Sequence, residues 1–276
     1  MLLVTGATGN VGAEVVRALT DAGEQVRALT RSDTSSGLPA GVEAVAGDLN
    51  RPDSLAPALA GVRGVFLLPG YEDMDETLAA IRAAGVERVV LLSGSSAGTG
   101  DTSNAVTAYM MRSEAAVTQS GVPWTILRPF GFMSNALRWR AQLQEGDVIR
   151  EPFADVHVAV IDPHDIAAVA ASALRSTEHE GHTYVLSGPQ ALRPADRVRI
   201  LGAALGRQLR FEAQSDADAR TQMSAQMPIE YVDAFFDFYV DGALDESQVQ
   251  PTVEEVLGRE PRSFEQWAAA HADAFR

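Results

Sequence analysis

The sequence predicts an α/β protein: a Rossmann-like doubly wound parallel sheet with a smaller C-terminal α/β lobe. Three observations carry this prediction. The chain opens with a strand, a glycine-rich turn and a helix. Short apolar strands then alternate with helical patterns, which is typical of a parallel sheet. The C-terminal third has a strand–turn–helix pattern of its own. We expect residues 1–134 and 156–187 to form the core, and residues 135–155 and 188–276 to form the lobe.

Composition limits the classes of function. The chain has 276 residues, of which 46% are hydrophobic, enough for a large packed core. A formal net charge of −15 argues against direct binding of nucleic acid, whose phosphates need Lys and Arg. We find no apolar run as long as a membrane helix and no signal-peptide pattern. Cys is absent, which excludes disulfides and thiolate metal sites. We therefore expect a cytoplasmic protein without membrane partners.

The first thirty residues read as a βαβ unit. Leu2 to Val4 form a short apolar run, and Gln25 to Leu29 form the next. Between them, apolar residues recur at helical spacing, and Gly23 suits the left-handed C-cap. The apolar positions of the helix are Val11, Val15, Val16 and Leu19.

The turn of this unit has the spacing GxxGxxG, a variant of the dinucleotide-binding fingerprint. Gly6 permits the sharp turn, Gly9 lets the backbone approach a pyrophosphate, and Gly12 allows close packing of helix on strand. The helix N-terminus offers free N–H groups to the phosphates, and Asn10 is the expected cap. We predict dinucleotide contacts at Gly6, Thr8, Gly9, Asn10, Val11 and Gly12.

The second strand ends at "ALTRSD", which sets the expected cofactor. Sites that prefer NAD place Asp or Glu here, whereas this chain has Arg31. A guanidinium grips a 2′-phosphate, so we predict NADP(H). Asp33 nearby complicates the local field.

The ends of the next three strands supply further candidates, because ligands sit beyond the carboxyl ends of parallel strands. Asp48 could accept a hydrogen bond from the adenine amino group, or cap a helix. Ser93 could orient the nicotinamide or a substrate carbonyl, or cap a helix. Leu49, Leu68 and Pro69 complete the predicted cofactor contacts.

The motifs "TGATGNVG", "TRSD", "GDLNRPDSL", "GVPWTILRPFGFMSN" and "IDPHDIAAVAASAL" resemble the NmrA-like group of atypical short-chain dehydrogenase/reductase proteins, as does the tail "TVEEVLGREPRSFEQWAAAHADAF". The resemblance covers nearly the whole chain. It implies a Rossmann-like sheet, a small lobe over the cofactor and a preference for NADP(H). Members of the group include quinone and azo-dye reductases and a redox-sensing regulator that binds the dinucleotide without turnover.

The stretch "AYMMRSEAAV" departs from reductase patterns. Ser113, not Lys, stands four residues after Tyr109, and all 22 basic residues are Arg. In the family that the chain resembles, a His or Lys often precedes the residue matching Glu114 by four positions, where this chain has Met110. Tyr109 could donate a proton at its ordinary high pKa, water could do so, or Tyr109 could simply pack.

Aromatic residues near the strand ends suit a flat substrate. We expect Tyr71, Phe130, Phe132 and Met133 to wall it against the nicotinamide, with core packing as the alternative. His179 and His182 lack metal-site spacing, so no metal is expected. We expect Asp165 to cap a helix or tie it to a loop, and Thr252 with Glu255 and Ser263 with Gln266 to form capping boxes.

The sequence thus predicts an NADPH-dependent oxidoreductase that transfers hydride directly to a quinone or a related conjugated carbonyl compound. The alternative is a non-enzymatic NADP(H)-sensing protein that acts through a protein partner. An epimerase would need acid and base residues near the ring, and the absence of Lys disfavours it. An apolar helical stripe over residues 232–240 could form core, substrate wall or the contact surface of a homodimer.

Overall fold

The computed structural model describes residues 1–31 and 37–276, so Asp33 lies outside the described residues. Seven strands of these residues form one parallel sheet in the order β3-β2-β1-β4-β5-β6-β8. The crossover between β3 and β4 returns the chain to the other side of β1. The topological switch point therefore lies between the neighbouring strands β1 and β4. The strands are β1 (Leu2–Val4), β2 (Val26–Thr30), β3 (Glu43–Ala46), β4 (Gly64–Leu67), β5 (Arg88–Leu92), β6 (Trp124–Pro129) and β8 (His182–Leu186).

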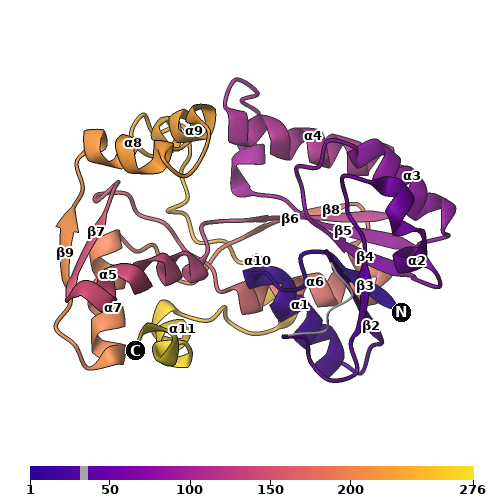
Figure 1. The fold of residues 1–276 in the computed structure, drawn as a ribbon, viewed down its shortest axis with the longest axis horizontal. Coiled ribbons are helices and arrows are strands. Elements are labelled where there is room, and N and C mark those ends of the chain that lie inside the picture. Colours follow the sequence, from indigo (N-terminus) through magenta and orange to yellow (C-terminus); the bar gives the residue numbers. More distant parts are fainter. Residues whose placement is uncertain (32–36) are drawn as a thin grey trace.

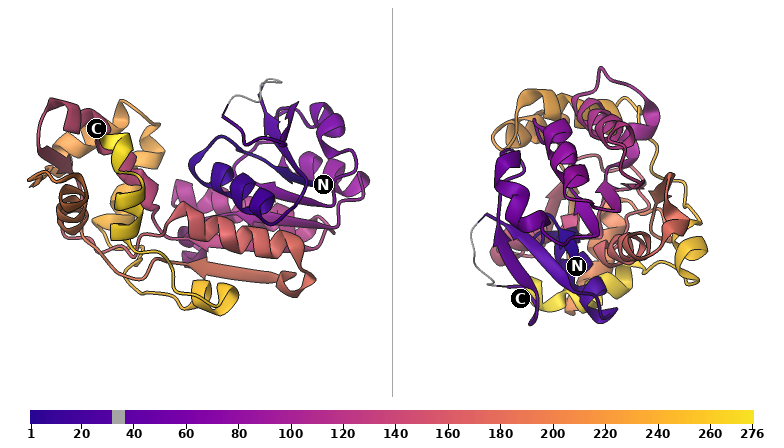
Figure 2. Two further views of the ribbon diagram at one scale, coloured as in Figure 1. Left: turned by 90° about the horizontal axis from the view of Figure 1, so that it is seen from below. Right: turned by 90° about the vertical axis from the view of Figure 1, so that its right-hand side faces the viewer.

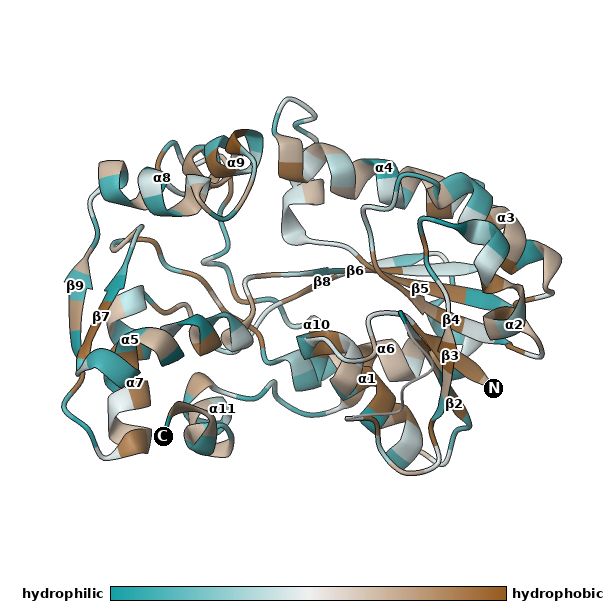
Figure 3. Ribbon diagram, viewed as in Figure 1, coloured by the Kyte–Doolittle hydropathy of each residue, from teal (hydrophilic) through white to brown (hydrophobic). Residues whose placement is uncertain are grey.

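Helices cover both faces of this sheet, as predicted (Figure 1). Helices α1 (Asn10–Asp21) and α6 (Pro163–Arg175) pack together on one face. On the other lie α2 (Ala56–Leu59), α3 (Met74–Ala83) and α4 (Ala105–Gln119). Successive strand residues point to opposite faces. Val90 accordingly joins the apolar cluster under α1 and α6, whereas Val89 joins the other. The buried strands form the hydrophobic band in Figure 3.

The lobe lies at one end of the sheet (Figure 2). In the described chain, β7 (Val148–Glu151) and β9 (Arg210–Ala213) pair in parallel. Trp139, Phe264 and Trp267 anchor a separate apolar core. The lobe helices are α5 (Arg140–Glu145), α7 (Pro194–Leu205), α8 (Asp216–Ser224), α9 (Ile229–Tyr239) and α11 (Phe264–Ala270). Short 3-10 turns are η1 (Pro52–Leu55), η2 (Ser95–Thr99), η3 (Met133–Trp139), η4 (Thr177–His179) and η5 (Ala272–Phe275).

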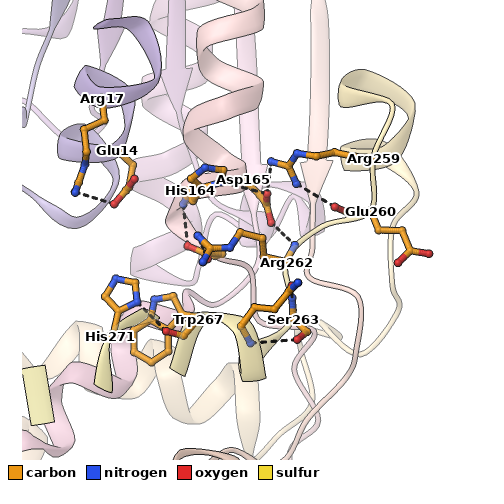
Figure 4. A network of polar contacts seen from close by, with 12 residues as sticks. Glu14, Arg17, His164, Asp165, Arg259, Glu260, Arg262, Ser263, Trp267 and His271 are labelled. Carbon is orange, nitrogen blue, oxygen red and sulfur yellow. Dashed lines mark hydrogen bonds and ion pairs between the residues drawn. The ribbon is translucent and has the colours of Figure 1, made fainter. Parts of the chain in front are cut away.

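A polar network joins the C-terminal segment to the core (Figure 4). After the lobe, the chain returns to the core as α10 (Thr252–Leu257), which packs on α6. The buried Asp165 carboxylate then accepts a hydrogen bond from the Arg262 backbone N–H at 2.6 Å. It also forms an ion pair with Arg259 at 2.7 Å. The prediction that Asp165 ties its helix to a loop is confirmed.

Two helix caps near this network had been predicted, and one was wrong. Ser263 and Gln266 form a capping box at the start of α11, as expected. The N-cap of α10 is Pro251, so Thr252 is already helical and forms no capping box with Glu255. Within residues 1–31 and 37–276, no helix combines the length and apolar character that crossing a membrane requires.

Candidate functional site

The glycine turn after β1 packs closely against the loop after β4 at the switch point. Gly6 has φ +60°, in the left-handed region, and a Cβ added there would lie 2.5 Å from Leu68 Cδ1. The Leu68 backbone N–H donates to Thr5 Oγ1 at 3.0 Å. Gly6 and Leu68 therefore meet at the crevice where doubly wound folds hold nucleotides, with Pro69 following at its edge.

The helix that follows starts without a side-chain cap. Its N-cap is Gly9, not the predicted Asn10, which is the first helical residue. A Cβ on Gly12 would lie 2.0 Å from the Gly6 carbonyl oxygen, so this glycine lets the helix approach the turn. Thr8, Gly9 and Asn10 are exposed, whereas Val11 is buried. An uncapped N-terminus with a bare, exposed approach fits a pyrophosphate.

Arg31 and Asp48 follow neighbouring strands at the same edge of the sheet. Arg31 comes directly after β2 and is exposed. Asp48 is exposed after β3, and its Oδ1 accepts from the Asn50 backbone N–H at 2.9 Å. Leu49 is buried, and its carbonyl accepts from Thr77 Oγ1. This edge therefore offers a guanidinium and a carboxylate beside the glycine turn.

A pocket of about 1040 Å³ lies between the loop after β4 and α4, with α9 residues on its other side. Tyr71, Tyr109 and Tyr231 line it. The Tyr109 ring meets Tyr231 edge-on, with centroids 6.2 Å apart. Burial raises the pKa of Tyr109, and burial followed by the Asp48 charge raises the pKa of Tyr71. Both phenols therefore keep their protons at neutral pH.

The residue in place of a catalytic lysine has a structural task. Ser113 Oγ accepts from the Gly70 backbone N–H at 3.0 Å and donates to the Tyr109 carbonyl at 2.9 Å. It thereby fastens the loop after β4 to α4. Met110 lies against the strand end, because a Cβ on Gly94 would be 3.3 Å from Met110 Cε. The position for which the family resemblance implies a His or Lys is thus filled by an apolar side chain.

Ser93 is committed to a buried ion pair. Its side chain is 3% exposed, and Oγ donates to Glu114 Oε1 at 2.6 Å. Arg128 binds both Glu114 oxygens, at 2.9 and 2.6 Å. This cluster holds the carboxyl ends of β5 and β6 against α4, and the Ser93 hydroxyl donates its hydrogen bond within it.

Sequence reasoning missed a buried carboxyl near the same strand ends. Glu246 is 4% exposed and accepts from Ser95 Oγ at 2.5 Å and from Tyr239 Oη at 3.1 Å. A Cβ on Gly131, just after β6, would lie 3.8 Å from Glu246 Oε2. Burial raises the Glu246 pKa although the hydrogen bonds oppose it, and burial raises the Tyr239 pKa well above its usual value. This pair can hold a proton beside the segments that follow β5 and β6.

A second pocket, of about 580 Å³, lies in the lobe beside this pair. Tyr239, Gly131 and Arg197 are among its lining residues, and it shares Met227 and Phe235 with the first pocket. The two pockets therefore adjoin at α9. The predicted wall residues divide: Tyr71 lines the first pocket, whereas Phe130 and Met133 are buried, Phe132 is half-buried, and these three line neither pocket.

The two histidines of "HEGH" pack against neighbouring side chains. His179 bonds to Ser172 Oγ and Tyr184 Oη at 3.0 and 2.9 Å, and His182 stacks on Tyr184. The described part of the chain contains no cluster of three or more His, Asp or Glu side chains suited to a metal ion.

A parallel sheet with an uncapped glycine turn at its switch point defines a Rossmann-like protein of the dinucleotide-binding class. The NmrA-like family model matches residues 1–268, and the chain belongs to this family.

Two curated relatives match over full length. The chain is 41% identical over 281 residues to the (4-alkanoyl-5-oxo-2,5-dihydrofuran-3-yl)methyl phosphate reductase of Streptomyces griseus, covering 100% of this chain and 99% of that protein. It is 37% identical over 284 residues to the NAD(P)H azoreductase of Xenophilus azovorans, with the same coverage.

Solved structures agree on the fold. An NADPH-dependent quinone oxidoreductase of Escherichia coli complexed with NADPH superposes with TM-score 0.79 at 23% identity, covering 98% of this chain and 99% of that one. A triphenylmethane reductase of Citrobacter sp. complexed with NADP(H) gives 0.80 at 22% identity, covering 99% of this chain and 100% of that one.

Proposed function

We propose that this protein is an NADPH-dependent oxidoreductase that reduces a conjugated carbonyl compound, with quinones as one member of that class. The observation that carries the proposal is the uncapped glycine turn at the switch point, with Arg31 at the same sheet edge and the first pocket beside Pro69. The relatives from Streptomyces griseus and Xenophilus azovorans are both named as reductases, which supports the same reaction class.

The chain's residues fit each part of the cofactor. The N-terminus of α1 would bind the pyrophosphate, and Arg31 the 2′-phosphate. Asp48 and Leu49 would contact the adenine, and Leu68, which packs against Gly6, and Pro69 would line the crevice. When bound, the nicotinamide supplies a hydride to the acceptor.

The substrate class follows from what the relatives reduce. The name of the Streptomyces griseus enzyme describes a lactone ring whose C=C bond is conjugated with carbonyl groups. The Escherichia coli neighbour is named for quinones. Both compounds accept hydride at carbon and place the resulting negative charge on oxygen. We therefore propose an acceptor of this kind, with Tyr71 and Tyr109 as aromatic walls of the first pocket.

The reaction needs a proton once hydride has been added to the acceptor. We assign its supply to Tyr239, which lines the second pocket, with Glu246 behind it at 3.1 Å. Because burial raises the pKa of Glu246, the carboxyl holds a proton closer to neutral pH than an exposed glutamate does. The Tyr239 hydroxyl gives up its proton, Glu246 replaces it, and solvent reprotonates Glu246. Tyr109, which lines the first pocket, is the alternative donor.

A non-enzymatic NADP(H) sensor is the second candidate function. The apolar Met110 at the position of a family acid favours it, since a sensor needs no proton donor. Such a protein would bind NADP⁺ and NADPH comparably and act through a protein partner.

The test is NADPH consumption, followed by absorbance, with a panel of small quinones, enones and acylated butenolides and with NADH in parallel. We expect turnover with a preference for NADPH. Tight NADPH binding without turnover across the whole panel would replace the reductase proposal with the sensor.

The same assay tests Arg31. Arg31→Ala should raise the KM for NADPH roughly tenfold to a hundredfold, because a charge-assisted hydrogen bond to phosphate is worth about 1.5–3 kcal/mol. The KM for NADH should stay within about twofold, since NADH has no 2′-phosphate. Arg17→Ala, on the exposed face of α1, is the control for loss of one surface charge. Equal losses for both cofactors would remove the 2′-phosphate assignment.

A further inference from the structure

The lobe contains a buried arginine whose charge nothing compensates directly. Arg197 lies in the first half of α7 and is 8% exposed. Within residues 1–31 and 37–276 its guanidinium makes no hydrogen bond and no ion pair, and its buried Nε has no acceptor. The guanidinium lies over the Trp139 ring, with Cζ 5.9 Å from the ring centroid. A buried, unpaired charge is costly, so its retention calls for a partner.

Glu151, the acid whose charge attracts Arg197, already has other partners. Glu151 is buried, and Arg138 takes both of its oxygens at 2.7 Å. Trp139 Nε1 donates to Glu151 Oε1 at 2.5 Å. These three hydrogen bonds take up most of the acceptor capacity of the carboxylate, and none of them comes from Arg197. Burial lowers the pKa of Arg197, and the Arg138 charge acts in the same direction against the attraction of Glu151.

The pocket in front of Arg197 has an excess of positive charge. Two guanidiniums, of Arg138 and Arg197, face one carboxylate, of Glu151, among its lining residues. A third lining arginine, Arg150, is balanced by an ion pair with Glu212 at 2.7 Å. Arg138 is the more accessible of the facing pair, with 58% of its side chain exposed. A local positive excess in a chain of net charge −15 favours an anionic ligand.

We propose that the second pocket binds a phosphate monoester group carried by the acceptor substrate, with Arg197 as its ion-pair partner and Arg138 beside it. A phosphate monoester presents three acceptor oxygens, so it can accept at once from the Arg197 guanidinium and from the Arg138 Nη1 that Glu151 leaves free, which a carboxylate with two oxygens does less well. The identity of the acceptor rests on the proposed function, but the anion site stands on the pocket alone. Tyr239 lines the same pocket, so the anion would anchor the acceptor beside the proposed proton donor.

The experiment is calorimetric titration of n-butyl phosphate into protein saturated with NADP⁺, so that the cofactor's own phosphate sites are filled. Butanol, butyrate and inorganic phosphate serve as comparison probes. We expect n-butyl phosphate to bind more tightly than each of them. Arg197→Gln should weaken its binding roughly tenfold to a hundredfold, the range for hydrogen bonds to charged groups.

Arg199→Gln is the matched control, because Arg199 lies on the same helix, is exposed and does not line the pocket. It should leave the affinity unchanged. Arg197→Lys, which keeps the charge but not the fork, should bind with intermediate affinity and serves if the glutamine variant does not fold. Removing an unpaired buried charge is expected to leave the melting temperature of Arg197→Gln unchanged or higher.

Several results would overturn the proposal. These are equal binding of butyrate, equal binding of inorganic phosphate, unchanged affinity in Arg197→Gln, or the same loss in Arg199→Gln. The outcome is separable from that of the reductase proposal. If n-butyl phosphate binding depends on Arg197 but the protein shows no turnover, the anion site is supported and the reductase proposal fails. If the protein reduces phosphorylated acceptors equally well with and without Arg197, the reductase proposal is supported and the anion site fails.

Discussion

At the scale of single residues, Glu246 determines how the proposed reaction handles its proton. It lies 151 positions from Ser95, which donates to it, and its segment "LDESQ" reads as a solvated acidic stretch. Nothing in spacing or periodicity marks it, because its environment is created by tertiary packing alone. The turn made by the three glycines and the position of Arg31 directly after β2 could be predicted because they depend on local sequence.

Replacing Glu246 by Gln tests its role in proton supply. The amide keeps the size of the side chain but cannot carry a proton to Tyr239. We expect kcat to fall about a hundredfold, within the range of general acid catalysis. The wild-type kcat should decline on the alkaline side as Glu246 ionises, and the variant should lose that limb. Glu254→Gln, an exposed carboxylate on α10, should keep the wild-type pH profile. An unchanged limb in Glu246→Gln would assign the proton to another group.

At the scale of elements, the N-terminus of α1 differs from the cap that local sequence rules predict. Asn10 has the better capping side chain, yet Gly9 takes the N-cap with extended backbone, φ −84° and ψ 174°. A side-chain cap would occupy the amides that a phosphate needs, so the local rule is broken where the ligand is expected. The strand, the turn and the helix themselves were predicted correctly because their apolar periodicity is strong.

Gly12→Ala tests whether close packing of the turn shapes the phosphate site. The new methyl would lie 2.0 Å from the Gly6 carbonyl oxygen, a backbone atom that cannot rotate away. We expect a loss of about 1–3 kcal/mol in the free energy of unfolding and at least a tenfold weaker affinity for NADPH. Gly23→Ala, at the other end of α1, is the control: it strains φ +78° but has open space around it. It should cost about 1 kcal/mol of stability and leave NADPH affinity unchanged. Equal NADPH affinities in the two variants would contradict the idea.

At the scale of the whole molecule, the sequence predicts the seven-stranded core better than the lobe. The core is built from local βα repeats, whereas the lobe sheet pairs Val148 with Arg210 across a long intervening segment. Charges that meet across such distances are likewise invisible in sequence. Arg197 reads as one polar residue in a helix, and only the packing of Glu151 against Arg138 leaves it without a partner.

Asp165 links α6 of the core to the segment that leads into α11 of the lobe. The contribution of this carboxylate to stability should depend on pH. Burial alone would raise the pKa of this carboxyl, but the His164 ring 3.6 Å away, the hydrogen bond from the Arg262 backbone and the ion pair with Arg259 together hold the pKa below its ordinary value. A lowered folded-state pKa means that the stabilisation is present above 3.8 and is lost as pH falls through the folded value. Asp165→Asn should therefore cost about 3 kcal/mol of unfolding free energy at neutral pH, as for a broken buried ion pair.

Denaturant titration of both proteins from neutral pH to about pH 3 measures this, because the protonated wild type comes to resemble the amide. The difference between them should stay constant from neutral pH to about pH 5 and shrink as the pH falls further toward the folded-state pKa. Asp273→Asn removes a 91%-exposed carboxylate near the C-terminus and should show no such trend. If Asp165→Asn costs the same free energy at every pH, the junction is held by shape and neutral hydrogen bonds. In that case the ion pair between Asp165 and Arg259 would not help to hold the lobe, which contains the second pocket, against the strand ends of the core.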